Sequence, residues 1–234
     1  MSDPGRRTRM LQLAAGAAFL AVAAVLVLIV ISASGSDDGG DTELEGVAEI
    51  NRSLQGIPQH ELILGDLKAP VELVEYADLQ CPYCKAFTED IVPSIIENQV
   101  KKGQAVIGFR NFVVIGKQSV AAGAAALAAG FQERGWNFIE IFYRNQGREN
   151  SGYADDAFLE AIAKAAGVKD LRLWNQNRAE QVVPVEQTTA EAEGLGFTGT
   201  PSFALGGLHI PGLEAIETPA SAGPLEEAIE DASH

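Results

Sequence analysis

The sequence predicts an α/β protein in which a mixed sheet is flanked by helices. Strand-like apolar runs lie at Val71–Tyr76 and Ala105–Val114, on either side of a helical segment that starts near Pro82. Near the C-terminus, Gly206-Gly207 follows a short apolar run and is a two-residue hairpin signal. Residues 117–196 show only helical patterns. A strand–helix–strand unit and a hairpin together form a mixed sheet that helices can cover.

The elements before residue 117 follow from apolar periodicity and chain breakers. They are, in order, a helix over Val47–Leu54, strands over His60–Leu64 and Val71–Tyr76, a helix from Pro82 to about Lys102 and a strand over Ala105–Val114. Val71–Tyr76 alternates less than an exposed strand does, so it is predicted to be central and buried. Pro93 is expected to kink or split its helix, because proline lacks the N–H that a helix interior needs.

The second half is predicted to be helical until the final strands. The expected elements are helices over Lys117–Arg134, Trp136–Arg144, Tyr153–Ala166, Lys169–Asn177 and Pro184–Leu195, strands over Ser202–Leu205 and Leu208–Ile210, and a helix over Pro224–Asp231. Large aromatic side chains recur at helical spacing, which favours a core over a binding platform. They are Phe131, Trp136, Phe138, Phe142, Tyr143, Phe158 and Trp174.

The N-terminal segment predicts the compartment. Leu13–Ile31 carries no charge, and residues 10–32 are long enough to cross a bilayer as a helix. Arginines precede this run and acidic residues follow it, so the N-terminus is expected in the cytoplasm and the rest outside. Ser32-Ala33-Ser34-Gly35 offers a signal peptidase small residues, but the apolar run is longer than a signal peptide needs. We expect an uncleaved, single-pass anchor in the cell membrane, with the cysteines in an oxidising compartment.

These patterns divide the chain into six parts. They are a cytoplasmic N-terminus (1–9), a transmembrane anchor (10–32), a flexible acidic linker (33–56), the first part of the α/β fold (57–116), an inserted helical subdomain (117–196) and the second part of the fold (197–234). The linker is too short to hold a dimerisation domain, so a monomer is expected. The net charge of −15 argues against nucleic acid as a partner, since phosphate binding needs clustered cations.

The sequence Y-A-D-L-Q-C-P-Y-C, ending at Cys84, places a Cys-x-x-Cys pair where a strand meets a helix. Cys81 and Cys84 are the only two cysteines of the chain. A thiolate at a helix N-terminus faces unpaired backbone N–H groups, which lower its pKa. Pro82 suits the first helical turn, and the spacing lets the two sulfurs form a disulfide. The pair is therefore predicted to be a redox-active dithiol.

Other interpretations of the pair are weaker. A four-cysteine zinc site needs two more thiols, and the histidines His60, His209 and His234 lack the usual spacing of metal ligands. Covalent haem attachment requires a histidine after Cys84, where this chain has Lys85. An inert disulfide over three residues would constrain the unfolded chain little. We therefore expect neither a metal nor a cofactor.

Glu75 lies in the predicted central strand, six residues before Cys81. An unpaired carboxylate in a buried strand is unfavourable, so its pKa is expected to rise. One interpretation is a proton acceptor that helps Cys84 lose its proton during exchange. The alternative is a side chain that points to solvent at a strand edge or pairs with a lysine. Spacing alone does not decide between them.

With these motifs in place, the chain resembles the DsbA-like oxidoreductases of the thioredoxin-fold superfamily, including their membrane-anchored bacterial members. The resemblance rests on V-E-Y-A-D-L-Q-C-P-Y-C, on the helical block before the final hairpin, and on T-G-T-P-S-F at residues 198–203. It covers the chain from about Glu61 onward. It implies a thioredoxin fold with an inserted helical subdomain, preceded here by one transmembrane helix.

The resemblance also implies roles for individual residues. Cys81 corresponds to the exposed nucleophile that forms a mixed disulfide, and Cys84 to the shielded resolving thiol. Pro201 corresponds to a cis-proline packed against the pair. The backbone of Thr200 would bind an extended substrate peptide. Without the cysteine pair, Thr200-Pro201 would be interpreted as an ordinary trans strand start.

The chain departs from the strong oxidants of this family between its two cysteines. Tyr83 follows Pro82, where those proteins have histidine, and tyrosine supplies no positive charge to a thiolate. Pro82 and Tyr83 are expected to tune the reactivity of the cysteine pair. Because Tyr83 replaces a histidine, the disulfide is expected to be less oxidising. Lys85 is a candidate for restoring local positive charge, or a solvated helix residue.

The leading functional prediction is an extracytoplasmic oxidoreductase that donates disulfides to exported proteins and is recycled by a membrane redox partner. The alternative is a membrane-anchored reductase or isomerase, which keeps the pair reduced. A weaker hypothesis is a non-catalytic binding or metal-handling module on the same scaffold.

Overall fold

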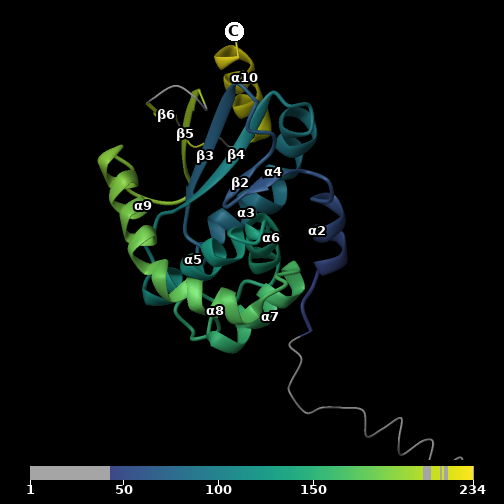
Figure 1. Ribbon diagram of the computed structural model, residues 1–234. Coiled ribbons are helices and arrows are strands. Elements are labelled where there is room, and N and C mark those ends of the chain that lie inside the picture. The colour runs from purple at the N-terminus through teal and green to yellow at the C-terminus, as the bar shows by residue number, and fades with distance from the viewer. Residues whose placement is uncertain (1–42, 208–211, 217, 219–220, 234) are drawn as a thin grey trace, which may run out of the picture. The chain divides into compact units, whose positions relative to one another are not determined.

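The computed structural model describes residues 43–207, 212–216, 218 and 221–233. These residues form one six-stranded sheet with the strand order β1-β2-β4-β3-β5-β6 (Figure 1). The strands are β1 (Gln59–His60), β2 (Ile63–Leu64), β3 (Val71–Ala77), β4 (Ala105–Asn111), β5 (Ser202–Gly207) and β6 (Glu214–Ile216). β3 pairs in parallel with β4 and antiparallel with β5, which confirms the predicted mixed sheet.

β3 is the central strand, and all seven of its residues are buried. Because successive side chains of a strand point to opposite faces, its apolar residues serve two cores. Leu73 and Ala77 belong to the larger core, whereas Val74 and Tyr76 belong to a smaller cluster on the other face. A strand buried on both faces has no polar side to alternate with, which explains its nearly continuous apolar run. Glu75 lies on the face of the larger core.

Four helical segments cover the face of the larger core. They are α3 (Pro82–Asp90), α4 (Val92–Ile95), the π-helical turn η1 (Ile96–Val100) and α10 (Ala222–Ala232). The expected break in the long helix is confirmed: α3 ends before Ile91, and Pro93 lies in the first turn of α4. Proline is tolerated there because first-turn N–H groups have no helical acceptor. α10 packs against α4, β3 and β5 and buries Leu225 and Ile229.

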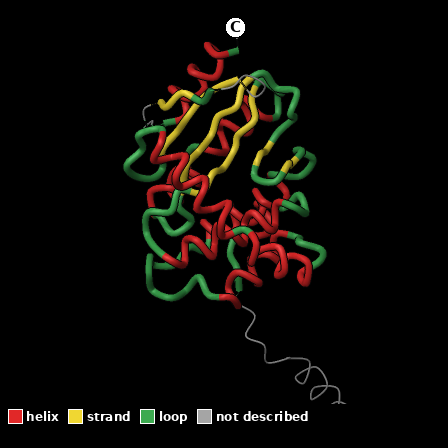
Figure 2. The backbone as a smooth tube through the Cα atoms, turned by 60° about the vertical axis from the view of Figure 1, so that its left-hand side comes forward, coloured by secondary structure: helices red, strands yellow, loops and turns green. Residues whose placement is uncertain are grey.

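Five helices connect β4 to β5. They are α5 (Lys117–Gly130), α6 (Gly135–Arg144), α7 (Asp156–Ala166), α8 (Leu171–Glu180) and α9 (Val182–Gly194). Figure 2 shows the long strands at one end of the molecule and most of these helices at the other. α9 returns along the sheet, where Ala192 joins the small cluster around Tyr76.

The aromatic residues of this region form a core, as predicted, with one exception. Trp136, Phe138, Phe142, Tyr143 and Trp174 are fully buried. Phe158 is half-buried and packs edge-on against Phe142. Phe131 is 48% exposed, so its assignment to the core was wrong. It is the C-cap residue of α5, where the chain turns away from the helix packing.

The predicted linker over residues 33–56 is not flexible throughout. Its last part forms α2 (Val47–Ser53), and Ile50 and Leu54 are buried in the larger core. The expected anchor at residues 10–32 lies outside the described residues. Among the residues that are described, no helix is both long and apolar enough to span a membrane.

Two strand predictions need correction. The strand expected over His60–Leu64 is instead a tight hairpin of β1 and β2, with Glu61 in the left-handed region at φ 53°. Gly206-Gly207 is not a turn, because both glycines belong to β5 and pair with β3. A Cβ on Gly206 would lie 2.9 Å from the Gly212 carbonyl oxygen, so close approach explains this glycine. β5 pairs with β6, and the strand expected over Leu208–Ile210 lies outside the described residues.

Candidate active site

The two cysteines lie where β3 leads into α3. Cys81 is the N-cap residue of α3, Pro82 opens the helix, and Cys84 lies in its first turn. Both cysteines are free thiols in this structure. Cys81 is only 5% exposed and Cys84 is fully buried, so Cys81 is less open than the expected exposed nucleophile. The order of exposure still leaves Cys81 as the thiol that solvent and substrates can reach.

The surroundings of Cys81 lower its thiol pKa from 9.0 to about 6. The largest contribution is the hydrogen bond from the Cys84 thiol, which burial of Cys81 opposes. Thr200 and the backbone N–H groups of Tyr83 and Cys84 lower the pKa further. All these groups stabilise the thiolate over the thiol. Cys81 is therefore largely a thiolate at neutral pH.

Cys84 and Glu75 titrate in the opposite direction. Burial raises the pKa of Cys84 well above 9.0, and the hydrogen bond to Cys81 and the charges of Glu75 and Cys81 add to this. Burial also raises the pKa of Glu75 to about 8, with a further contribution from the charge of Cys81. The site thus combines one acidic thiol, Cys81, with two groups that retain their protons at neutral pH, Cys84 and Glu75.

Glu75 is fully buried, and neither of its carboxyl oxygens has a hydrogen-bond partner. This excludes the alternative in which it points to solvent or pairs with a lysine. It follows from the strand register: Glu75 pairs with Phe109 on β4 and Phe203 on β5, in the centre of the sheet. An unpaired buried carboxyl is costly, and groups of this kind concentrate at functional sites.

The segment before β5 covers the dithiol. The Thr200–Pro201 peptide bond is cis, as expected from the resemblance, so the trans alternative is wrong. The Cys81 thiol donates a hydrogen bond of 3.5 Å to the Thr200 carbonyl oxygen. The Thr200 hydroxyl is buried and has no hydrogen-bond partner. Residues 119 positions apart in the sequence therefore meet at one sulfur atom.

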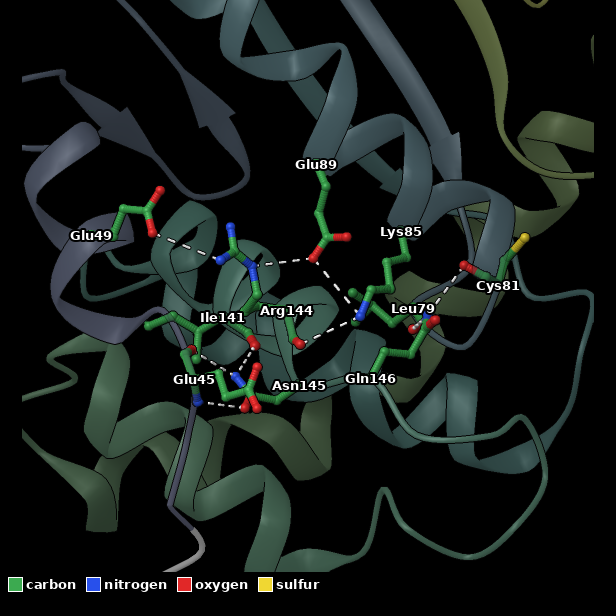
Figure 3. A network of polar contacts seen from close by, with 10 residues as sticks. All are labelled: Glu45, Glu49, Leu79, Cys81, Lys85, Glu89, Ile141, Arg144, Asn145 and Gln146. Carbon is green, nitrogen blue, oxygen red and sulfur yellow. Dashed lines mark hydrogen bonds and ion pairs between the residues drawn. The ribbon is translucent and has the colours of Figure 1, made fainter.

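An open groove of about 440 Å³ lies beside the dithiol, between α3 and the Thr200–Pro201 turn. Tyr83, 75% exposed, lines it together with Phe87 and Ile91. Lys85 does not add positive charge here. Its ammonium group lies 3.8 Å from a Glu89 carboxylate oxygen and contacts the Arg144 carbonyl, while the Cys81 sulfur points the other way (Figure 3).

Three polar residues around the loop were not predicted to belong to the site. Buried Asp78 accepts hydrogen bonds from the backbone N–H groups of Gln80, Val114 and Ile115. Gln146 donates to the carbonyl oxygens of Leu79 and Cys81, and Tyr143 donates to the carbonyl of Asp78. Apart from Gln80, their partners are backbone groups distant in sequence. Only the proximity of Asp78 to the cysteines was a local signal.

Within the described ranges, no cluster of three or more His, Cys, Asp or Glu side chains is arranged to hold a metal ion. The arrangement is instead that of a thiol pair with unequal acidity, as thiol–disulfide exchange requires.

Comparison with known proteins places this site in a family. The family model described as thioredoxin matches residues 58–231, which is well over half of the chain. The chain belongs to the thioredoxin family. The match includes the cysteine pair, the helices between β4 and β5, and the Thr200–Pro201 turn.

The relatives within the thioredoxin family are named for disulfide bond formation. A probable disulfide bond formation protein D of Bacillus cereus is 28% identical over 160 residues, or 66% of this chain and 74% of that protein. The disulfide bond formation protein D of Bacillus subtilis is 31% identical over 115 residues, which span 48% of this chain and half of that protein. The crystal structure of oxidised BdbD from Bacillus subtilis shares the fold, with a TM-score of 0.65 and 24% identity over 76% of this chain and 96% of that one.

These relatives and the free Cys-x-x-Cys pair agree on the kind of chemistry. This thioredoxin-family protein is an enzyme, a DsbA-like protein thiol–disulfide oxidoreductase.

Proposed function

We propose that this protein donates disulfides to exported proteins through the Cys81–Cys84 pair. The observation that carries the proposal is the contrast in acidity between the two thiols: the pKa of Cys81 falls to about 6, while that of Cys84 rises. A stabilised Cys81 thiolate favours the reduced form of the enzyme, so its disulfide tends to pass to a substrate. The relatives named for disulfide bond formation support the same direction.

The exchange takes two steps. A substrate thiolate attacks the Cys81 sulfur of the enzyme disulfide, and Cys84 leaves as a thiolate that takes up a proton. A second substrate thiolate then attacks the substrate sulfur of the mixed disulfide and releases Cys81 as a thiolate. Two electrons pass from substrate to enzyme, one substrate disulfide forms and the enzyme becomes a dithiol. A membrane redox partner would reoxidise the pair.

Glu75 is proposed to exchange the proton of Cys84. Its carboxyl group is buried on the face of β3 that carries the larger core. It lacks hydrogen-bond partners, and its pKa is raised to about 8. A charge on Glu75 raises the pKa of Cys84, so ionisation of one of the two groups disfavours ionisation of the other. Glu75 protonates the leaving Cys84 thiolate during donation and takes the proton back during reoxidation.

Thr200 and Pro201 are proposed to hold the substrate chain. The Thr200 carbonyl oxygen lies 3.5 Å from the Cys81 sulfur and accepts its proton only when Cys81 is a thiol. In a mixed disulfide that proton is absent, so the carbonyl is free to accept an N–H from an extended peptide. Tyr83, largely exposed on the rim of the neighbouring groove, offers an apolar surface to the substrate.

The protein is further proposed to be a single-pass protein of the cell membrane, with its N-terminus in the cytoplasm and the dithiol outside. The length and flanking charges of residues 10–32 support this. Protease treatment of intact spheroplasts tests it. Before the treatment, the protein should be recovered in the membrane fraction. Protease added outside the cells should then degrade the redox domain. Protection from protease, or release as a shortened soluble form, would contradict the orientation or the uncleaved anchor.

The reduction potential of the pair tests the direction of electron flow. We would equilibrate the full-length chain in detergent with glutathione buffers and measure the reduced fraction by alkylation. A potential well above that of the glutathione pool supports disulfide donation. A potential in the range of thioredoxin favours a reductase or isomerase. Failure to equilibrate with thiols would instead favour a non-catalytic module.

A further inference from the structure

We propose that Gln146 is a positioning residue of the redox site, whose carboxamide holds the Leu79–Cys81 loop so that the Cys81 sulfur faces the start of α3. The inference rests on the proposed role of Cys81 as the reacting thiol. The Gln146 side chain donates to two carbonyl oxygens of that loop. Gln146 Nε2 lies 2.8 Å from the Leu79 oxygen and 3.1 Å from the Cys81 oxygen. A primary amide has two hydrogens, so both are used.

The Cys81 carbonyl also accepts the first hydrogen bond of α3, from the Lys85 backbone N–H at 3.1 Å. Its direction therefore fixes the angle at which α3 leaves the loop. The N–H groups of Tyr83 and Cys84 belong to that first turn and stabilise the Cys81 thiolate. Gln146 thus acts on the sulfur through the backbone, without touching it.

Contacts at the end of α6 hold Gln146 in place. It follows α6, and Figure 3 shows the end of that helix fastened on several sides. The Asn145 side chain accepts from the Glu45 N–H at 2.7 Å and donates to the Ile141 carbonyl, which caps α6. The Arg144 guanidinium lies 3.2 Å from the Glu89 carboxylate on α3. These contacts fix the backbone at Gln146, so its side chain can hold the Leu79–Cys81 loop in one orientation.

Gln146→Met tests the proposal, because methionine has a similar length and no N–H donor. The rate at which iodoacetamide alkylates Cys81 in the full-length protein would be followed against pH by mass spectrometry. We expect the rate at pH 6 to fall about fivefold, because the Cys81 pKa rises by about one unit. The disulfide should become about fivefold less oxidising against glutathione, since the reduced form loses thiolate stabilisation. Gln146→Glu removes the same donors and adds a negative charge, so its effect should be at least as large.

Gln132→Met is the matched control. Gln132 also bonds backbone groups through its side chain, donating to the Asp170 carbonyl and accepting from the Lys169 and Asp170 N–H groups, none of which belongs to the dithiol loop. It should change thermal stability but not the Cys81 profile. The proposal is overturned if both Gln146 variants shift the profile no more than Gln132→Met does. If the parent is alkylated first at Cys84, the assigned role of Cys81 fails instead, and the two failures are thereby distinguished.

Discussion

At the scale of single residues, the site separates acidities within a few neighbouring groups. Cys81 has hydrogen-bond donors at its sulfur, whereas Glu75 has none at its carboxyl oxygens. Burial disfavours the charge on both, but only Cys81 has donors that outweigh it. The number of donors therefore decides which group is ionised at neutral pH, and two predictions follow from that difference.

The first concerns Glu75→Gln. The folded-state pKa of Glu75 is about 8, above its ordinary 4.5, so its contribution to stability is lost as the pH rises through this range. Glutamine does not titrate. We expect the variant to become more stable relative to the parent between about pH 5 and pH 8, by about 3 kcal/mol. Urea unfolding of both reduced proteins at each pH measures the difference, in which contributions of other groups cancel. A difference that does not change with pH would contradict the assigned burial.

The second concerns the hydrogen bond between the thiols. Cys84→Ala removes the group that contributes most to the low pKa of Cys81. The Cys81 pKa should rise by about one unit or more toward 9.0, whereas Cys84→Ser, which keeps a donor, should raise it less. The absorbance of the thiolate against pH reports both values. Equal values in the two variants would show that the donor is not the cause.

At the scale of elements, the β1–β2 hairpin packs directly against the corner between α5 and α6. A Cβ on Gly135 would lie 2.4 Å from the Glu61 carbonyl oxygen, and one on Gly130 would lie 2.9 Å from the Glu61 backbone. Trp136 Nε1 donates to the Leu62 carbonyl at 2.9 Å, which fastens the hairpin to α6. The edge of the sheet is thus held by helices that come more than sixty residues later.

Gly135→Ala tests this contact. The added methyl group meets backbone that cannot move without shifting the hairpin, so we expect a loss of about 2 kcal/mol in the free energy of unfolding. Gly194→Ala is the control: this glycine lies in α9 with nothing within 4 Å of its Cβ position, and alanine there should be neutral or slightly stabilising. Denaturant unfolding compares the two. If both variants lose a similar, small amount of stability, the β1–β2 hairpin shifts to accommodate the added methyl group.

At the scale of the whole molecule, the redox loop is the point where separate parts of the chain meet. Asp78 ties the loop to the β4–α5 connection, and buried Gln80 joins it to α5 through the Ser119 hydroxyl. Gln146 joins it to the end of α6, and Thr200 covers it from the start of β5. The helices between β4 and β5 therefore form part of the support of the active site.

Asp78→Ala tests how much this convergence contributes to stability. The substitution leaves the buried N–H group of Gln80 and the part-buried N–H groups of Val114 and Ile115 without their acceptor, which should cost about 3 kcal/mol. Asp66→Ala is the comparison, because Asp66 accepts one exposed N–H bond, from Lys68, and should cost less than about 1 kcal/mol. Thermal or urea unfolding reports both, and equal losses would argue against a special role for Asp78.

The sequence by itself determined the features that depend on local rules. The continuous apolar run of β3, the break at Pro93 and the position of Cys81 at a helix N-terminus could all be predicted, because each depends on residues close together in the chain. The mixed sheet followed from the order of the expected elements, and the family resemblance led to the cis bond before Pro201. Glu75 could be named from spacing, but not its environment.

Only the tertiary structure decided the rest. The pairing of Gly206 and Gly207 with β3, where a turn was expected, depends on a distant strand, as does the lack of any partner for Glu75. Asp78 and Gln146 form hydrogen bonds with backbone groups. Nearly every residue carries the same backbone groups, so these partners leave no pattern in the sequence. The physical reason is common to all of them: burial and hydrogen-bond partners are properties of contacts between distant segments, and those contacts set the acidity of Cys81 and Glu75.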